Sequence, residues 1–148
     1  MRSAAEWHLV WRALRAVVIV RLALQWVPYA RIRARSARRR EARKRTGFRG
    51  EASRRDLTHD PVALAWAIRA AARRVPRATC LTQALALEAL LADAGLTADV
   101  RIGVARARDG SFEAHAWVVR GDDVLIGGRR DLARFAPLPP HSSDLLRR

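Results

Sequence analysis

Residues 79–95 read Thr-Cys-Leu-Thr-Gln-Ala-Leu-Ala-Leu-Glu-Ala-Leu-Leu-Ala-Asp-Ala-Gly, and this stretch decides the fold. Its leucines and alanines recur at the three-and-four spacing that places apolar residues on one face of a helix. Thr79 belongs to the residue types that cap helix starts, and Gly95 to those that follow helix ends. We therefore predict a helix that has Cys80 in its first turn and ends at Ala94-Gly95.

The sequence after this helix changes to a period of two. Val100, Ile102 and Val104 alternate with charged residues or glycine, as in a strand with one buried face. Asp109-Gly110 is typical of a two-residue hairpin turn. The predicted strands are 99–104, 112–119 and 124–126, with a second turn at 121–123. The proline-containing tail after Asp131 is expected to be irregular.

Two helices are predicted on the N-terminal side. Large apolar residues recur at helical spacing from Trp7 to Val27, where Pro28 should end or kink the helix. Asp60 and Pro61 are typical of a second helix start, which predicts a helix that runs to about residue 74.

The segment between these helices is strongly basic. Residues 31–55 hold 12 of the 29 basic residues, and Ile32 and Phe48 are the only large apolar ones. Such a segment cannot bury itself, so we expect a linker or a solvated helix. Helices followed by a small antiparallel sheet predict an α+β fold, divided into a basic helical arm and linker at 1–57 and a core at 58–148.

The chain has 29 Lys and Arg against 14 Asp and Glu, a formal net charge of +15. This charge favours anionic partners and admits a nucleic-acid-binding protein without catalysis as the alternative function. No zinc pattern or RNA-binding signature supports that alternative, so nucleic acid is not an expected partner. The single cysteine allows no intrachain disulfide and no thiolate metal cluster, which suits a reducing cytoplasm.

The apolar stretch at 16–27 raises the question of a membrane. It contains Arg21 and is too short and too charged to span a bilayer. No small-residue cleavage site follows it, which argues against a signal peptide. We expect a cytoplasmic protein whose N-terminal arm, rich in tryptophan and arginine, contacts a membrane surface.

Cys80 is the candidate nucleophile. The first turn of a helix has unpaired N–H groups and a dipole that favour negative charge, and the thiolate is the reactive form of cysteine. The same N–H groups can stabilise an oxyanion. The alternative is a small buried apolar residue, the usual state of a free cysteine.

His115 is the candidate base, because a strand holds its side chain in a fixed direction. The alternative is a packed polar residue. An orienting carboxylate would complete the set. Pairing across the turn at 121–123 places the histidine's partner at about 127–131, where Asp131 is the only carboxylate. Asp122 and Asp123 lie at the turn tip, too far along the strand.

The order of the candidate residues resembles that in transglutaminase-like cysteine enzymes. It is a cysteine at a helix start, then a histidine on a following strand, then an acid on the next strand. Three segments resemble the leader peptidase of lasso peptide biosynthesis: residues 80–95, Arg-Ile-Gly-Val at 101–104 and Phe-Glu-Ala-His-Ala-Trp-Val at 112–118. The resemblance covers about residues 60–138. It implies a transglutaminase/papain-like core in which Cys80 is the nucleophile and His115 the base.

The family's third residue is an aspartate on the strand after the histidine. Here that strand reads Val-Leu-Ile-Gly-Gly, and Asp131 is the substitute that the geometry suggests. The resemblance implies removal of the leader from a ribosomally made precursor, whose core then passes to an ATP-dependent lasso cyclase. The chemistry requires no metal and no organic cofactor. The length leaves no room for a leader-binding domain, so a separate leader-recognition protein is expected.

Overall fold

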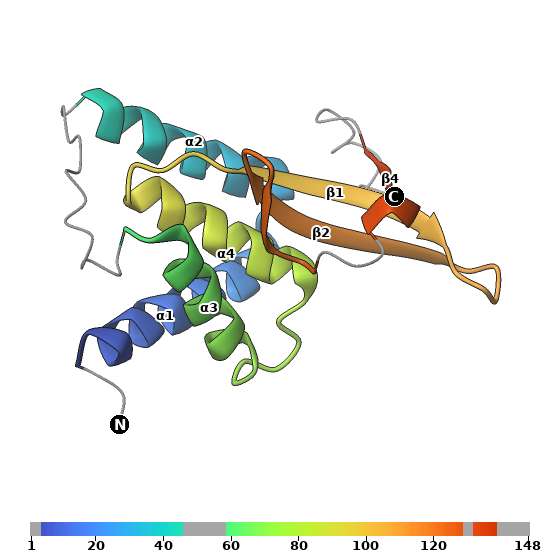
Figure 1. Ribbon diagram of the computed structural model, residues 1–148, viewed down its shortest axis with the longest axis horizontal. Helices are drawn as coiled ribbons and strands as arrows, with labels where there is room; N and C mark the ends of the chain where they lie inside the picture. The colour runs from blue at the N-terminus through green and yellow to red at the C-terminus, as the bar shows by residue number, and fades with distance from the viewer. Residues whose placement is uncertain (1–3, 46–58, 129–131, 139–148) are drawn as a thin grey trace.

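The computed structural model describes residues 4–45, 59–128 and 132–138. Four helices lie together, and a long β-hairpin extends beyond them (Figure 1). The helices are α1 (Ala4–Trp26), α2 (Tyr29–Arg45), α3 (Pro61–Ala72) and α4 (Cys80–Asp93). The strands are β1 (Asp99–Arg106), β2 (Phe112–Arg120), β3 (Asp123–Ile126) and β4 (Ala136–Pro137), with a short 3-10 turn at Leu132–Arg134. The predicted α+β class is confirmed.

The starts of α3 and α4 are capped as their sequences predict. Asp60 Oδ1 accepts a hydrogen bond of 3.0 Å from the Val62 N–H at the start of α3. Thr79 Oγ1 accepts one of 3.3 Å from the Thr82 N–H at the start of α4. Each cap satisfies an N–H that has no partner inside its helix. The position of Cys80 in the first turn of α4 is thereby fixed.

The strands form one antiparallel sheet in the order β3-β2-β1-β4. In β1 and β2 the register places Gly103 opposite His115. The first turn is longer than Asp109-Gly110 predicts, because the Ala107 N–H donates to Ser111 O over 2.8 Å and so closes a three-residue loop. Gly110 takes the positive φ, 86°, that such loops require.

The prediction that the whole tail after Asp131 is irregular was wrong. β4 pairs with Gly103 and Val104 of β1, and the Leu138 N–H donates to Ile102 O over 2.8 Å. A two-residue strand is too short to show a period in the sequence. Pro137 is tolerated because β4 is an edge strand, which needs fewer N–H donors.

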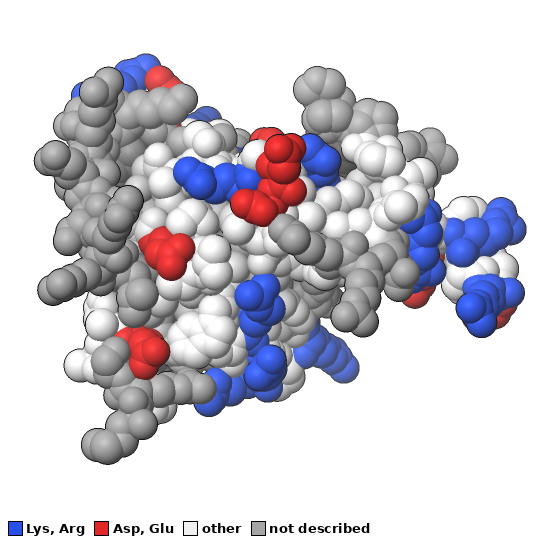
Figure 2. Space-filling view, in the orientation of Figure 1, with Lys and Arg blue, Asp and Glu red and all other residues white. Residues whose placement is uncertain are grey.

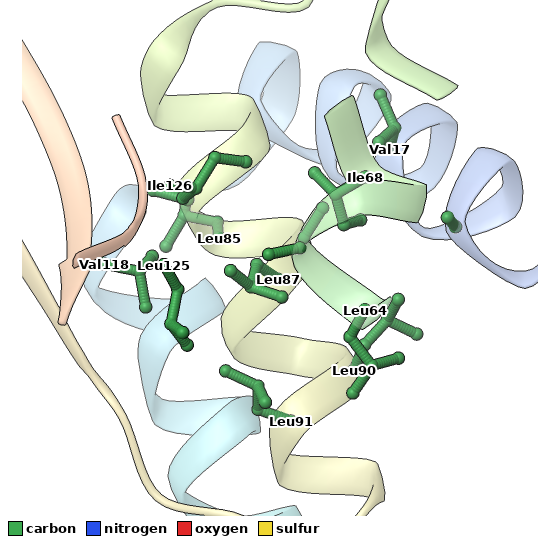
Figure 3. Packing of buried hydrophobic residues seen from close by; sticks show 14 of the residues in the cluster. Val17, Leu64, Ile68, Leu85, Leu87, Leu90, Leu91, Val118, Leu125 and Ile126 are labelled. Atoms are coloured by element: carbon green, nitrogen blue, oxygen red, sulfur yellow. The ribbon is translucent and has the colours of Figure 1, made fainter. Parts of the chain in front are cut away.

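The sheet separates two apolar clusters. In the larger one, apolar side chains of α3, α4 and β3 meet, with Leu64, Leu85 and Ile126 among them (Figure 3). Ala116 and Val118 of β2 also belong to this helix-side cluster. The smaller cluster consists of Ala105, Trp117, Val119 and Phe135. Successive residues of β2 alternate between the clusters, as strand geometry requires.

Residues 31–45 of the segment expected to be a linker or a solvated helix belong to α2, which packs on α4, and residues 46–55 lie outside the described residues. Arg33 Nη2 lies 3.3 Å from Glu88 Oε1, whose side chain is 2% exposed. Arg39 Nη1 lies 3.4 Å from Asp93 Oδ1 at the surface. Burial is the largest single effect and lowers the pKa of Arg33, but the charges and hydrogen bonds of Glu88 and Tyr29 together outweigh it, so the pKa of the guanidinium is raised.

The N-terminal helix also belongs to the core. Leu9, Ala13 and Val17 of α1 are part of the helix-side cluster, and α1 packs against α3 and α4. The predicted boundary near residue 57 falls outside the described residues and stays a prediction. The described part of the arm shares its packed interior with the residues that follow.

Candidate active site

Cys80 is the first residue of α4 and is half-buried against the helix-side cluster. The next N–H groups are engaged, since the Gln83 N–H donates to Thr79 O over 3.0 Å and that of Thr82 to the Thr79 side chain. Within the described chain, the N–H groups of Cys80 and Leu81 donate to no such acceptor. Two free donors therefore lie beside the sulfur, where a negative charge would be stabilised.

His115 lies in the middle of β2, opposite Gly103. Its ring centroid is 5.2 Å from that of Phe135 and 6.1 Å from that of Trp117. The glycine makes room for this packing, because a Cβ at Gly103 would lie 2.9 Å from Phe135 Cβ and 3.0 Å from Trp117 Cη2. The imidazole is thus half-buried among aromatic rings rather than free in solvent.

A backbone carbonyl holds the imidazole. His115 Nε2 lies 2.7 Å from Gly127 O. A carbonyl oxygen can only accept a hydrogen bond, so Nε2 must carry the hydrogen. In the neutral ring the lone pair then lies on Nδ1, which is the nitrogen able to accept a proton.

The backbone conformation and the close packing at position 127 both require glycine. Its φ is 102°, a conformation that favours glycine. A Cβ there would lie 2.8 Å from Trp117 Cα and 3.0 Å from Ala116 O. The close approach of this residue to β2 is what brings its carbonyl within reach of His115.

An open pocket of about 270 Å³ adjoins the imidazole. Its lining residues are Glu113, Ala114, His115, Gly127, Leu132, Arg134 and Phe135. Arg134 Nη2 and Glu113 Oε2 form an ion pair of 2.6 Å at its edge, and the guanidinium also stacks 4.6 Å from the Phe135 ring centroid. The pocket therefore combines an aromatic wall with a balanced pair of charges.

The predicted site residues are only partly brought together. Helix α4 packs on β2, the strand of His115. Cys80 contacts the helix-side cluster, whereas His115 contacts Trp117 and Phe135 of the smaller one. No hydrogen bond joins Cys80 and His115, both of which are described, and Cys80 is not among the pocket's lining residues. Asp131 lies outside the described residues.

Sequence reasoning missed the contributions of Gly127, Arg134 and Phe135. The signal for Gly127 was the Gly-Gly pair at the end of β3, since adjacent glycines mark positive φ angles. No comparable signal marks Phe135, which reaches the histidine only through the pairing of β4 with β1. Among the described residues, no group of three or more His, Cys, Asp or Glu side chains could hold a metal ion.

Most of the chain matches a known protein family. A family model described as transglutaminase-like superfamily matches residues 10–139, which is most of the chain. No curated protein and no solved structure matches it. The matched range begins within α1 and extends beyond β4, so it includes Cys80, His115 and Asp131.

Proposed function

Because the chain belongs to the transglutaminase-like superfamily, we propose that it is a cysteine peptidase with Cys80 as nucleophile and His115 as base. The observation that carries the proposal is the placement of Cys80. It stands in the first turn of α4 beside two free N–H groups, in a chain of a family whose members place a cysteine at a helix start. A buried structural cysteine would need no such donors.

The reaction is acyl transfer. His115 takes the proton of the Cys80 thiol, and the thiolate adds to the carbonyl carbon of the scissile peptide bond. The N–H groups of Cys80 and Leu81 stabilise the oxyanion. The C–N bond then breaks as the imidazolium of His115 gives its proton to the leaving amine. Water attacks the resulting thioester while His115 takes a proton from it, which releases the carboxylate and restores the thiol.

The tautomer of His115 suits this role. With its hydrogen donated from Nε2 to Gly127 O, the ring presents the basic Nδ1 to the reaction. Nδ1 must then come within hydrogen-bond reach of Cys80 Sγ. In the free protein the ring packs with Trp117 and Phe135, which the sheet separates from the cluster that Cys80 contacts, so we propose that the imidazole changes its position when substrate binds.

We propose that the substrate is the precursor of a lasso peptide, cleaved between leader and core in the cytoplasm. The proposal rests on the resemblance of residues 80–95, 101–104 and 112–118 to the lasso leader peptidase. A separate leader-recognition protein would deliver the precursor, and an ATP-dependent cyclase would use the amine that cleavage frees. The new amine is the nucleophile that ring closure onto a side-chain carboxylate requires.

Mass spectrometry of the cognate precursor tests the function. The precursor is incubated with the leader-recognition protein and with wild type, Cys80→Ala or His115→Ala. We expect leader release by wild type, none by Cys80→Ala, and a loss of about 10²–10⁴-fold for His115→Ala. The matched control is His8→Ala, which removes an exposed histidine of α1 and should cleave as wild type does.

Two outcomes would contradict the proposal. Undiminished cleavage by Cys80→Ala would remove the nucleophile. Activity of wild type on unrelated peptides of equal length, at the rate seen with the precursor, would remove the substrate but leave the cysteine chemistry. Circular dichroism of each variant establishes that loss of activity is not loss of fold.

A further inference from the structure

Helix α1 has two apolar faces, and only one of them is buried. The buried residues are Leu9, Val10, Ala13, Val17 and Val20. The exposed apolar residues are Trp7, Trp11, Val18, Ile19, Leu22 and Trp26, which we call the α1 stripe. Five members of the α1 stripe lie along one side of the helix, because they are spaced by four or seven residues. They are Trp7, Trp11, Val18, Leu22 and Trp26.

The α1 stripe exposes more apolar surface than a single apolar residue on a protein surface does. Trp26 is 85% exposed, Trp11 60% and Trp7 50%. Tryptophan is costly to leave in water because of its large apolar area. Contiguous exposed apolar surface of this kind marks an interaction site.

Arginines accompany the α1 stripe. Arg15 lies within it, between Trp11 and Val18, while Arg12 and Arg21 are partly exposed on the same helix. None of the ion pairs of the described residues involves these three arginines. The one acid of α1, Glu6, lies in its first turn and is partly buried. Tryptophan next to unpaired arginine is the combination that suits the headgroup region of an anionic bilayer.

The geometry fits a helix that lies on a membrane. In the described ranges, no helix has the combination of length and apolarity needed to cross one. The opposite face of α1 is fixed by packing on α3 and α4, so the α1 stripe is presented by a rigid body. Figure 1 shows α1 among the helices, away from the projecting β1–β2 hairpin.

A second copy of the chain is a less suitable binding partner for the α1 stripe than a membrane. Pairing two α1 stripes would bring Arg15 of both copies into one apolar interface, and the one acid of α1, Glu6, lies nine positions away in the first turn. An unpaired buried charge is strongly unfavourable. Lipid phosphate provides the neutralising charge directly. We propose that the α1 stripe binds the protein to the surface of a membrane containing anionic phospholipid.

Co-sedimentation of the full-length protein with vesicles tests this inference. The vesicles consist of phosphatidylcholine alone or of phosphatidylcholine with phosphatidylglycerol. We expect binding to the anionic vesicles, about tenfold or more stronger than to the neutral ones. Combining Trp7→Ser, Trp11→Ser and Trp26→Ser should weaken it about tenfold or more, with an unchanged circular dichroism spectrum. Arg15→Gln alone should weaken it by several-fold.

The β1–β2 hairpin provides the control. Figure 2 shows basic side chains gathered at its projecting end, where Arg106 and Arg108 stand. Phe112, 75% exposed, contacts Arg106 with its ring 5.0 Å from the guanidinium carbon. Phe112→Ser should bind vesicles as wild type does. Equal weakening by Phe112→Ser, no binding by wild type, or loss of a concentration-dependent dimer in the tryptophan variant would each overturn the inference.

Discussion

The Gly127 carbonyl accepts a 2.7 Å hydrogen bond from His115 Nε2, in the place where a carboxylate would orient the imidazole of a catalytic triad. Both groups fix the ring and its tautomer. A carbonyl differs in having no net charge, so it stabilises the imidazolium less than a carboxylate does. The strand β3 ends at Ile126, and Gly127, which follows it, supplies the acceptor through its backbone.

The first prediction concerns Gly127→Ala. The new methyl group would meet Trp117 and Ala116, on a backbone whose φ of 102° is already unfavourable for alanine. We expect the free energy of unfolding to fall by about 2–4 kcal/mol. Displacement of the carbonyl from His115 should lower kcat/KM about 10²-fold in the remaining folded protein, measured by precursor cleavage.

Gly128→Ala is the matched control for this substitution. Gly128 also has a positive φ, 79°, but a Cβ there meets nothing within 4 Å. It should cost only about 1 kcal/mol, measured by urea unfolding, and leave cleavage nearly unchanged. Equal effects of the two substitutions would show that backbone strain, and not the position of the Gly127 carbonyl, accounts for the loss.

The second prediction concerns Asp131→Asn. If Gly127 O orients the histidine, the carboxylate at 131 is not needed for that purpose, and kcat should change by no more than a few-fold. If Asp131 is the third catalytic residue, loss of its charge should lower kcat by about 10⁴-fold, as for the orienting acid of a triad. The rates expected for Asp131→Asn under the two roles thus differ by several orders of magnitude, and one single-turnover measurement of cleavage distinguishes them.

The sequence was sufficient for the elements with strong local signals. Asp60, Thr79 and the apolar period of 80–94 place two helices nearly to the residue, and the change to a period of two after Asp99 places β1. It was insufficient for the packing of α2 on α4, to which the pair of Arg33 with Glu88 contributes. Glu88 is buried between apolar neighbours in α4, and Arg33 is 55 positions away in the chain.

The positions of the two candidate residues in the fold were predictable, but their arrangement relative to each other was not. Cys80 and His115 follow from a helix start and a strand centre, which are local features. The acceptor of the histidine is a backbone atom, and backbone atoms have no signature in residue identity. The β-bulge between Val118 and Val119 also shifts the register of β3 against β2, so counting across the turn cannot give the final partner.

The third prediction concerns the two candidate residues in the absence of substrate. Iodoacetamide reacts with thiolates, so its rate of reaction with Cys80 reports how far the protein activates the sulfur. Because the imidazole comes within reach of Cys80 only when substrate binds, we expect alkylation of His115→Ala at neutral pH to proceed at nearly the wild-type rate. His8→Ala should also react as wild type does. Alkylation of His115→Ala about tenfold slower than that of wild type would mean that His115 already acts on Cys80 in the free protein.

The fourth prediction concerns the attachment of α2 to α4. Arg33→Ala leaves the buried Glu88 carboxylate without the 3.3 Å contact to this guanidinium, and we expect a loss of about 1–3 kcal/mol of unfolding free energy.

Arg39→Ala is the matched control, because its 3.4 Å pair with Asp93 is exposed and should contribute less than about 1 kcal/mol. If the cost of Arg33→Ala arises from the charge on Glu88, adding Glu88→Gln should recover part of it, since a neutral amide is cheaper to bury. Urea unfolding of the four proteins measures these differences. Equal losses for Arg33→Ala and Arg39→Ala would indicate that α2 is held by its apolar contacts, with Ile32 the buried residue that remains to be tested.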